Sequence, residues 1–129
     1  VVAAPAGRDE VYLGTSGGKI VRSTKANVTR PAFENKSFPK SGTGQISDLQ
    51  FTGYRGNMLF ILQRNAAGNS RVLRDISGGY LTDSQVEIVG DFTTPVNNLI
   101  NSIAPANENL AMTAGEVEST YAFVGKVTA

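Results

Sequence analysis

The stretch VYLGTSGGKIVRS, residues 11–23, decides the fold class of this chain of 129 residues. Two short runs rich in apolar and β-branched residues flank the turn Ser16-Gly17-Gly18, whose glycines supply the positive φ angles of a tight hairpin. Similar short runs, separated by Gly, Asn, Ser and Thr at intervals of roughly eight to twelve residues, continue along the chain. Helical periodicity is nearly absent. The sequence therefore predicts an all-β fold of many short antiparallel strands.

The chain also repeats itself at a period of roughly fifty residues. The tripeptide Ala4-Pro5-Ala6, with the apolar run that follows it, returns as Ala104-Pro105-Ala106 with a second such run. A third copy, residues 46–62, lies between them. Because repeats of forty to fifty residues built from short strands are typical of β-propeller blades, we expect a single repeat domain over residues 1–129. Its repeats are expected at about 1–40, 41–95 and 96–129.

Each repeat except the last is expected to form a four-stranded antiparallel sheet. The expected strands are residues 1–4, 10–15, 19–23 and 32–38, then 46–51, 58–63, 71–75 and 85–89, then 100–104, 109–114 and 120–125. No fourth strand is expected in the last repeat. The sequence thus predicts an incomplete ring of about two and three-quarter blades, belonging to a larger propeller.

Residues 11–24 resemble the central hairpin of Asp-box (BNR-type) repeats, which occur in β-propellers of the sialidase- or sortilin-like superfold. In those repeats a strand ending in Gly-Thr turns through glycines into an apolar residue, a basic residue and Ser. Residues 73–79 (LRDISGG) are similar, and residues 103–110 resemble the loop between the first two strands. The resemblance implies a propeller fold.

The sequence departs from the Asp-box motif Ser-x-Asp-x-Gly-x-x-Trp, in which the Asp side chain caps a tight turn. Lys25 and Asn27 stand where Asp and Gly would be in the first repeat. In the second repeat Ser77 stands in place of the Asp while Gly79 keeps the Gly, and the chain has no Trp. Propellers serve as sialidases, glycan hydrolases, lectins, assembly factors and virion parts, so the resemblance alone does not choose a function.

The composition excludes several function classes. With 12 basic and 11 acidic residues and no long run of either sign, nucleic acid is not expected as a partner. No apolar stretch is long enough for a transmembrane helix, so no membrane span is expected. The chain contains neither Cys nor His, which excludes serine–histidine and cysteine–histidine catalysis within it. We expect no metal site and no cofactor.

Paired carboxylates are the one catalytic arrangement that this composition permits. Asp48 and Glu116 are the candidate pair, and Asp75, Asp91 and Glu108 also lie near expected strand ends. Two carboxylates facing one cleft could cleave a glycosidic bond. Carboxylates in such positions are more often turn-forming or solvating residues, and that interpretation is favoured here.

Two tyrosines, Tyr54 and Tyr80, fall in expected turns and are candidates for stacking on a sugar ring or a protein partner. Candidates for a sialidase-like cluster are Arg22, Arg64 and Arg74 together with Tyr54. However, Arg22 and Arg74 occupy equivalent places in successive repeats, where basic residues more often pack their stems on the sheet and pair locally. We therefore expect Arg22 and Arg74 to be structural.

The last expected strand offers an edge for a further strand, marked by Thr120, Tyr121 and Phe123. Copies of the chain, or the remainder of a longer chain, would supply that strand.

Two functions follow as expectations. The first is a non-catalytic structural or adhesion module, extracellular or virion-associated (phage-tail-like), that binds protein or glycan through its loops. The second is a fragment of a propeller glycoside hydrolase with paired carboxylates. The absence of His and Trp and the near-neutral charge favour the first.

Overall fold

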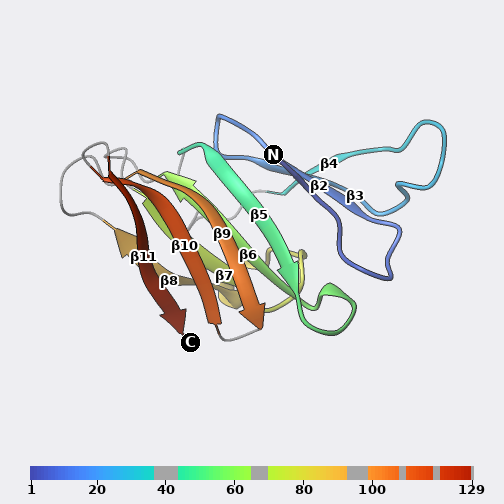
Figure 1. The fold of residues 1–129 in the computed structure, drawn as a ribbon. Helices are drawn as coiled ribbons and strands as arrows, with labels where there is room; N and C mark the ends of the chain where they lie inside the picture. Colours follow the sequence, from blue (N-terminus) through green and yellow to red (C-terminus); the bar gives the residue numbers. More distant parts are fainter. Residues whose placement is uncertain (37–43, 65–69, 93–98, 108–109, 118–119, 129) are drawn as a thin grey trace.

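A computed structural model describes residues 1–36, 44–64, 70–92, 99–107, 110–117 and 120–128 (Figure 1). These residues form eleven strands in three antiparallel sheets. Two of the sheets have four strands and the third has three. The expectation of an all-β fold made of four-stranded antiparallel sheets is confirmed.

The strands follow one another in chain order within each sheet. Sheet 1 contains β1 (Val2–Ala3), β2 (Val11–Gly14), β3 (Ile20–Ser23) and β4 (Glu34–Lys36). Sheet 2 contains β5 (Ile46–Thr52), β6 (Met58–Arg64), β7 (Ser70–Asp75) and β8 (Val86–Phe92). Sheet 3 contains β9 (Leu99–Asn107), β10 (Leu110–Val117) and β11 (Thr120–Thr128). Every expected strand overlaps an observed one; those of sheet 3 are longer than expected because ladder pairing continues past the turn residues that bounded them.

In the turn between β2 and β3, the predicted positive φ occurs at Gly18 but not at Gly17. Gly18 has a φ of 83°, and its amide donates to the carbonyl of Thr15 at 3.3 Å. The Thr15 hydroxyl accepts a hydrogen bond from the amide of Lys19 at 2.9 Å. The turn between β6 and β7 lies outside the described residues.

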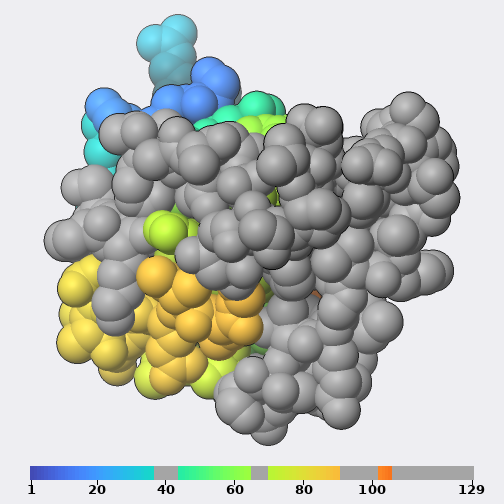
Figure 2. All heavy atoms as spheres, turned by 90° about the vertical axis from the view of Figure 1, so that its left-hand side faces the viewer, coloured from blue at the N-terminus to red at the C-terminus, as the bar shows by residue number. Residues whose placement is uncertain are grey.

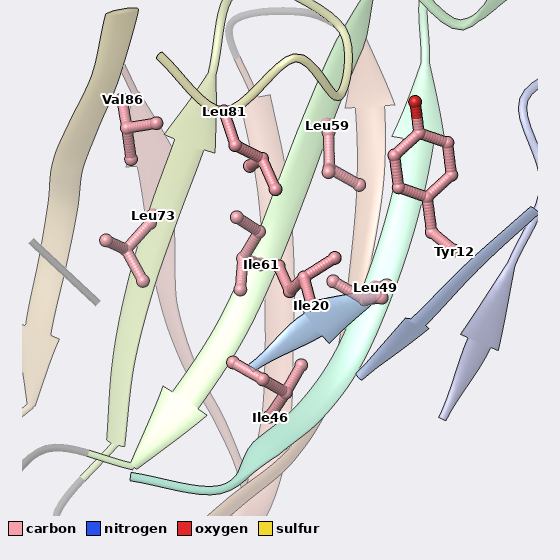
Figure 3. Close-up of a cluster of buried hydrophobic side chains, with 9 residues drawn as sticks. All are labelled: Tyr12, Ile20, Ile46, Leu49, Leu59, Ile61, Leu73, Leu81 and Val86. Atoms are coloured by element: carbon pink, nitrogen blue, oxygen red, sulfur yellow. The ribbon is translucent and has the colours of Figure 1, made fainter. Parts of the chain in front are cut away.

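Sheets 1 and 2 pack face to face around a cluster of nine buried side chains (Figure 3). Tyr12 and Ile20 come from sheet 1, and strands β5 to β8 and the loop before β8 supply the others: Ile46, Leu49, Leu59, Ile61, Leu73, Leu81 and Val86. Full burial of a large apolar side chain contributes roughly 1.5–3 kcal/mol. The interface between the two sheets is therefore a main source of stability.

Sheet 2 is buried on both faces, because sheet 3 covers the face opposite to sheet 1. Phe60, Leu62 and Val72 of sheet 2 pack with Ile103 of β9 on that side. The five central residues of β6 are all buried, as expected for a strand covered on both sides. Tyr12 and Phe60 are buried, one in each cluster, and Phe51 is partly buried against the cluster that contains Tyr12.

The first strands of the sheets approach each other closely. The amide of Ile46 in β5 donates to the carbonyl of Thr15, just beyond β2, at 3.0 Å. A Cβ atom on Gly14 would stand 2.4 Å from Cγ2 of Ile46, so this contact requires glycine. On its other side β5 lies beside β9 (Figure 1). Strand β5 is thus held between sheet 1 and sheet 3.

Within the described ranges, the structure contains no helix with the length and apolar character needed to cross a membrane.

Candidate functional site

Two loops at one end of sheet 2 carry the most exposed aromatic side chains of the described residues. The β5–β6 loop contains the 3₁₀ turn η2 (Tyr54–Gly56), and the β7–β8 loop contains η3 (Asp83–Gln85). Because antiparallel strands alternate in direction, both loops lie at the same end of the sheet. Tyr54 is 82% exposed and Tyr80 is 59% exposed. We call Tyr54, Arg55, Ile76 and Tyr80 the loop platform.

The β7–β8 loop is built around the buried carboxylate of Asp75. Its Oδ1 accepts from the amide of Ser77 at 2.9 Å and from the Ser77 hydroxyl. Its Oδ2 accepts from the amides of Gly79, at 2.7 Å, and Leu81, at 3.1 Å. Backbone donors that would otherwise be orphaned in a buried turn are thereby satisfied. The loop is consequently fixed from its beginning to Leu81.

This arrangement changes the interpretation of the turn drawn from the sequence. Ser77 stands where the Asp-box aspartate was expected, but Asp75, two residues earlier, supplies the carboxylate that binds the loop amides. The interpretation of Asp75 as a turn-forming residue is confirmed. The side chain is fully buried, so its role is the support of the loop.

Arg8, from the β1–β2 loop of sheet 1, joins the two loops of sheet 2. Its Nη2 donates to the carbonyl of Gly78 at 2.7 Å and to the carbonyl of Gly56 at 3.2 Å. Its Nε lies 3.0 Å from Oε2 of Glu10, which holds the guanidinium in place. Arg55 contacts sheet 1 in return, donating to the carbonyl of Gly7 at 3.3 Å. The end of the interface between the sheets is thus closed by arginine side chains on backbone carbonyls.

Tyr12 is bonded to Glu10, the residue that pairs with Arg8. Its hydroxyl donates to Oε1 of Glu10 at 3.0 Å, and its ring lies 4.9 Å from the ring of Phe51, measured between centroids. Burial raises the pKa of Tyr12 to about 12, with the hydrogen bond to Glu10 and the charge of Glu10 as further causes. The phenol is therefore neutral at physiological pH and serves as a hydrogen-bond donor.

The platform loops are held in backbone conformations that L-residues seldom adopt. Arg55 has a φ of 55° and Leu81 a φ of 59°. Gly79 has a φ of 110°, and a Cβ atom there would stand 2.3 Å from the hydroxyl oxygen of Tyr12. Conformations of this kind persist only where the surrounding contacts over-determine them. Here the Asp75 carboxylate and Arg8 provide those contacts.

The ring of Tyr80 rests on a buried arginine of the neighbouring sheet. The guanidinium carbon of Arg22 lies 5.1 Å from the ring centroid, a cation–π distance. Arg22 in turn donates to Oε1 of Glu34 through Nε, at 3.0 Å, and through Nη2, at 2.6 Å. Burial is the largest influence and opposes the charged form, but the hydrogen bond to Glu34 and the interactions with Tyr12 together outweigh burial, so the pKa of Arg22 lies above its usual value. The orientation of Tyr80 is thus fixed while much of its ring stays exposed.

The two repeat-equivalent arginines make the same local pair. Arg22 of β3 binds Glu34, directly opposite it in β4, and Arg74 of β7 binds Glu87, directly opposite it in β8. Both arginines are buried. The expectation that Arg22 and Arg74 pair locally is confirmed for these contacts.

The structure gives Asp48 a structural environment. Its Oδ1 accepts hydrogen bonds from the backbone amide of Leu49, at 2.9 Å, and from Nε2 of Gln50, at 3.2 Å. Its Oδ2 accepts a hydrogen bond from the backbone amide of Ile103 at 3.0 Å. Asp48 lies within β5 and not at a loop tip. Both of its oxygens accept hydrogen bonds, and the bond to Oδ2 joins β5 to β9.

Glu116, the other candidate carboxylate, lies in β10 opposite Leu99 and Tyr121; its side chain lies outside what the structure describes. In the strand register, Thr113 is the β10 residue opposite Ile103, the partner of Asp48. Three residues of strand span roughly 10 Å, so the backbone of Glu116 is offset along β10 from the Asp48 contact. Side chains of the two candidate catalytic residues are not brought together by any described contact.

The expected partner-strand edge is strand β11. Thr120 and Tyr121 stand in register with Val117 and Glu116 of β10, and Phe123 with Ala114. Within the part of the chain that the structure describes, β11 pairs with β10 alone. The edge thus remains a prediction for a partner strand.

Arg8 and Glu10 are the residues of this site whose roles the sequence interpretation missed. Arg8, Glu10 and Tyr12 alternate along the chain as they enter β2, and alternation places residues on one face of a strand. That alternation was the available signal for the cluster. The sequence contains no signal for the positive φ of Leu81, because leucine is not a residue type that favours this conformation.

This end of the molecule presents the loop platform to solvent. It offers two exposed phenol rings and an exposed arginine on a fixed backbone. A search of the described residues finds no group of three His, Cys, Asp or Glu side chains arranged to hold a metal ion.

Comparison with known proteins gives no relative: no family model, no curated protein and no solved structure matches the chain.

Proposed function

We propose that this chain is a non-catalytic structural or adhesion module of the β-propeller type, which binds a protein or a glycan through its loops. The observation that carries the proposal is the stacking of three antiparallel sheets in chain order, with their first strands side by side: β1 beside β5, and β5 beside β9. Blades of a propeller are arranged around their axis in this way. An extracellular or virion-associated setting, such as a phage tail, suits a module of this kind.

The proposal includes completion of the ring by further copies or by further chain. Sheet 2 is covered on both faces, by sheet 1 and by sheet 3. Each flanking sheet offers its other face to a neighbour of the same kind. Head-to-tail contacts of this type close into rings when the rotation per unit permits. Two copies would give six sheets, within the usual range of four to eight blades.

The loop platform is the proposed contact surface. Tyr54 and Tyr80 are exposed, and Tyr80 and Arg55 are each tied to sheet 1, through Arg22 and through the carbonyl of Gly7. Tyrosine and arginine supply large contact area at low entropic cost and dominate binding hot spots. Figure 2 shows that atoms of residues 70–90, in yellow and orange, reach the surface on the face that it draws.

The test is binding by the intact chain to arrayed glycans and to candidate surface proteins. Tyr54→Ala and Tyr80→Ala are expected to reduce binding at least about tenfold, the usual cost of a hot-spot tyrosine. Ile88→Ala is the matched control, because Ile88 is an exposed apolar residue of β8 and lies outside the platform. Binding that survives both tyrosine substitutions would show that the platform is not the contact surface.

The alternative function, a fragment of a propeller glycoside hydrolase, depends on Asp48 and Glu116. The engagement of both Asp48 oxygens with neighbouring donors supports the non-catalytic proposal. Hydrolysis of glycans by the intact chain, abolished by both Asp48→Asn and Glu116→Gln, would favour the alternative.

A further inference from the structure

The two four-stranded sheets share a row of residues that runs across all four strands. In sheet 1 the row is Ala3, Tyr12, Arg22 and Glu34. In sheet 2 it is Gln50, Phe60, Arg74 and Glu87. In each row the third strand supplies a basic residue, the second strand places a large apolar residue beside it, and the fourth strand places a glutamate opposite it.

The arginine and glutamate of each row are bonded. Nη2 of Arg22 lies 2.6 Å from Oε1 of Glu34, and Nη2 of Arg74 pairs with Oε2 of Glu87. Both arginines are buried, whereas the glutamate side chains are about half exposed, at 53% and 45%. A buried guanidinium requires a partner for its charge. In both sheets the carboxylate of the fourth strand meets that requirement.

Sheet 3 contains the first three positions of the same row. The register places Ala104 opposite Met112 and Met112 opposite Lys126. Arg22, Arg74 and Lys126 follow one another at a constant spacing along the chain, and Lys126 is the single charged residue of β11. The position of the acidic residue is the one that the described strands leave unfilled.

We infer that the outer edge of β11 binds an extended segment that carries a glutamate or aspartate opposite Lys126. This inference rests on the proposed function and specifies the chemistry of the partner that completes sheet 3. Strand β11 has nine residues, and an edge of that length presents a row of backbone donors and acceptors to which a strand can add. The pair at Lys126 sets the register of the added strand, because a slip by one residue would move the carboxylate to the other face.

The partner that occupies the edge of β11 is an acidic peptide segment. It is not one of the described strands of a second folded copy. Strands β4 and β8, which carry Glu34 and Glu87, are already paired with β3 and β7 in their own sheets. Their outer edges could pair with β11 of another copy, but Glu34 and Glu87 already bind Arg22 and Arg74 in their own sheets. The carboxylate of a free extended segment has no such prior partner and is available to Lys126.

The probe is a synthetic peptide of residues 82–92, TDSQVEIVGDF, which is the fourth strand of sheet 2 and contains Glu87. It is added to the intact chain labelled with ¹⁵N, and the amide resonances of β11 are followed. Because opposite charges on facing residues of neighbouring strands attract and like charges repel, Lys126→Glu is expected to weaken binding about threefold or more. A peptide with Glu87→Lys should bind the Lys126→Glu chain more tightly than the unmodified peptide does.

The control variant is Lys19→Glu, which makes the same charge change at an exposed lysine of the β2–β3 turn and should leave binding unchanged. Lys126→Gln, which removes the charge at nearly constant size, serves if Lys126→Glu fails to fold.

Equal affinity of both peptides for both chains would overturn the pairing with Lys126. Absence of peptide binding, shifts confined to β3 or β7, or a dimer that Lys126→Glu dissociates would overturn the peptide partner. None of these results bears on Tyr54 and Tyr80, so a failure here is distinguishable from a failure of the proposed function.

Discussion

The carboxylate of Asp48 in β5 accepts a hydrogen bond from the backbone amide of Ile103 in β9, with 3.0 Å between Oδ2 and the amide nitrogen. This bond joins the first strands of two sheets that are separated by three intervening strands in the chain. It supplements the apolar contact of Ile103 with Phe60, Leu62 and Val72. This polar bond and the apolar contact together hold sheet 3 against sheet 2.

Asp48→Ala is expected to destabilise the fold by about 1–3 kcal/mol, the cost of leaving partly buried donors without an acceptor. Asp48→Asn retains one acceptor oxygen and should cost less. Urea unfolding followed by tyrosine fluorescence measures both, because the chain has no Trp. Asp9→Asn, at an exposed aspartate, is the control. Full stability of Asp48→Ala would show that the bond to Ile103 contributes nothing.

Asp75→Asn should be more damaging than Asp48→Asn. The Asp75 carboxylate is fully buried and accepts from three backbone amides and one hydroxyl, and an amide nitrogen in place of one oxygen would face donors. Breaking a buried network of this kind typically costs about 3 kcal/mol or more. Thermal unfolding measures the loss. A melting temperature like that of Asp9→Asn would contradict the role of Asp75 in the loop.

Gly79→Ala is expected to destabilise the fold for two reasons. The φ of 110° is strained for any residue with a Cβ atom, and that atom would stand 2.3 Å from the Tyr12 hydroxyl oxygen. Gly17→Ala is the matched control, because no atom lies within 4 Å of a Cβ atom at Gly17. Circular dichroism during heating compares the two variants. If Gly17→Ala loses as much stability as Gly79→Ala, the close approach to Tyr12 is not the cause.

The stability of the fold should fall at alkaline pH through Tyr12. Its folded-state pKa, about 12, lies above the ordinary value of 10.0, so folding favours the protonated phenol. This contribution is fully present below about pH 10 and is lost as the pH rises towards 12. The difference in unfolding free energy between the wild type and Tyr12→Phe, measured from pH 8 to 12, should shrink in that range. A difference that stays constant with pH would show that Tyr12 titrates normally.

The sequence alone determined the strands and their grouping into antiparallel sheets. Apolar alternation and the glycine turn at residues 16–18 are local signals, and ladder pairing between successive strands follows from them. The local pairing of Arg22 and Arg74 was also predictable, because each partner lies on the next strand of the same sheet. The exposure of Tyr54 and Tyr80 followed from their places in turns.

Only the tertiary structure decided what lies between the sheets. Arg8 reaches carbonyls 48 and 70 residues away in the chain, at Gly56 and Gly78, and such contacts depend on how one sheet stacks on the next. The use of Asp48 as a link to Ile103 has the same origin. Local sequence sets backbone conformation and strand order, but the distance between two side chains on different sheets is set by the packing of every residue in the interface. Asp48, a candidate catalytic carboxylate, therefore became a contact between sheets only when the sheets were assembled.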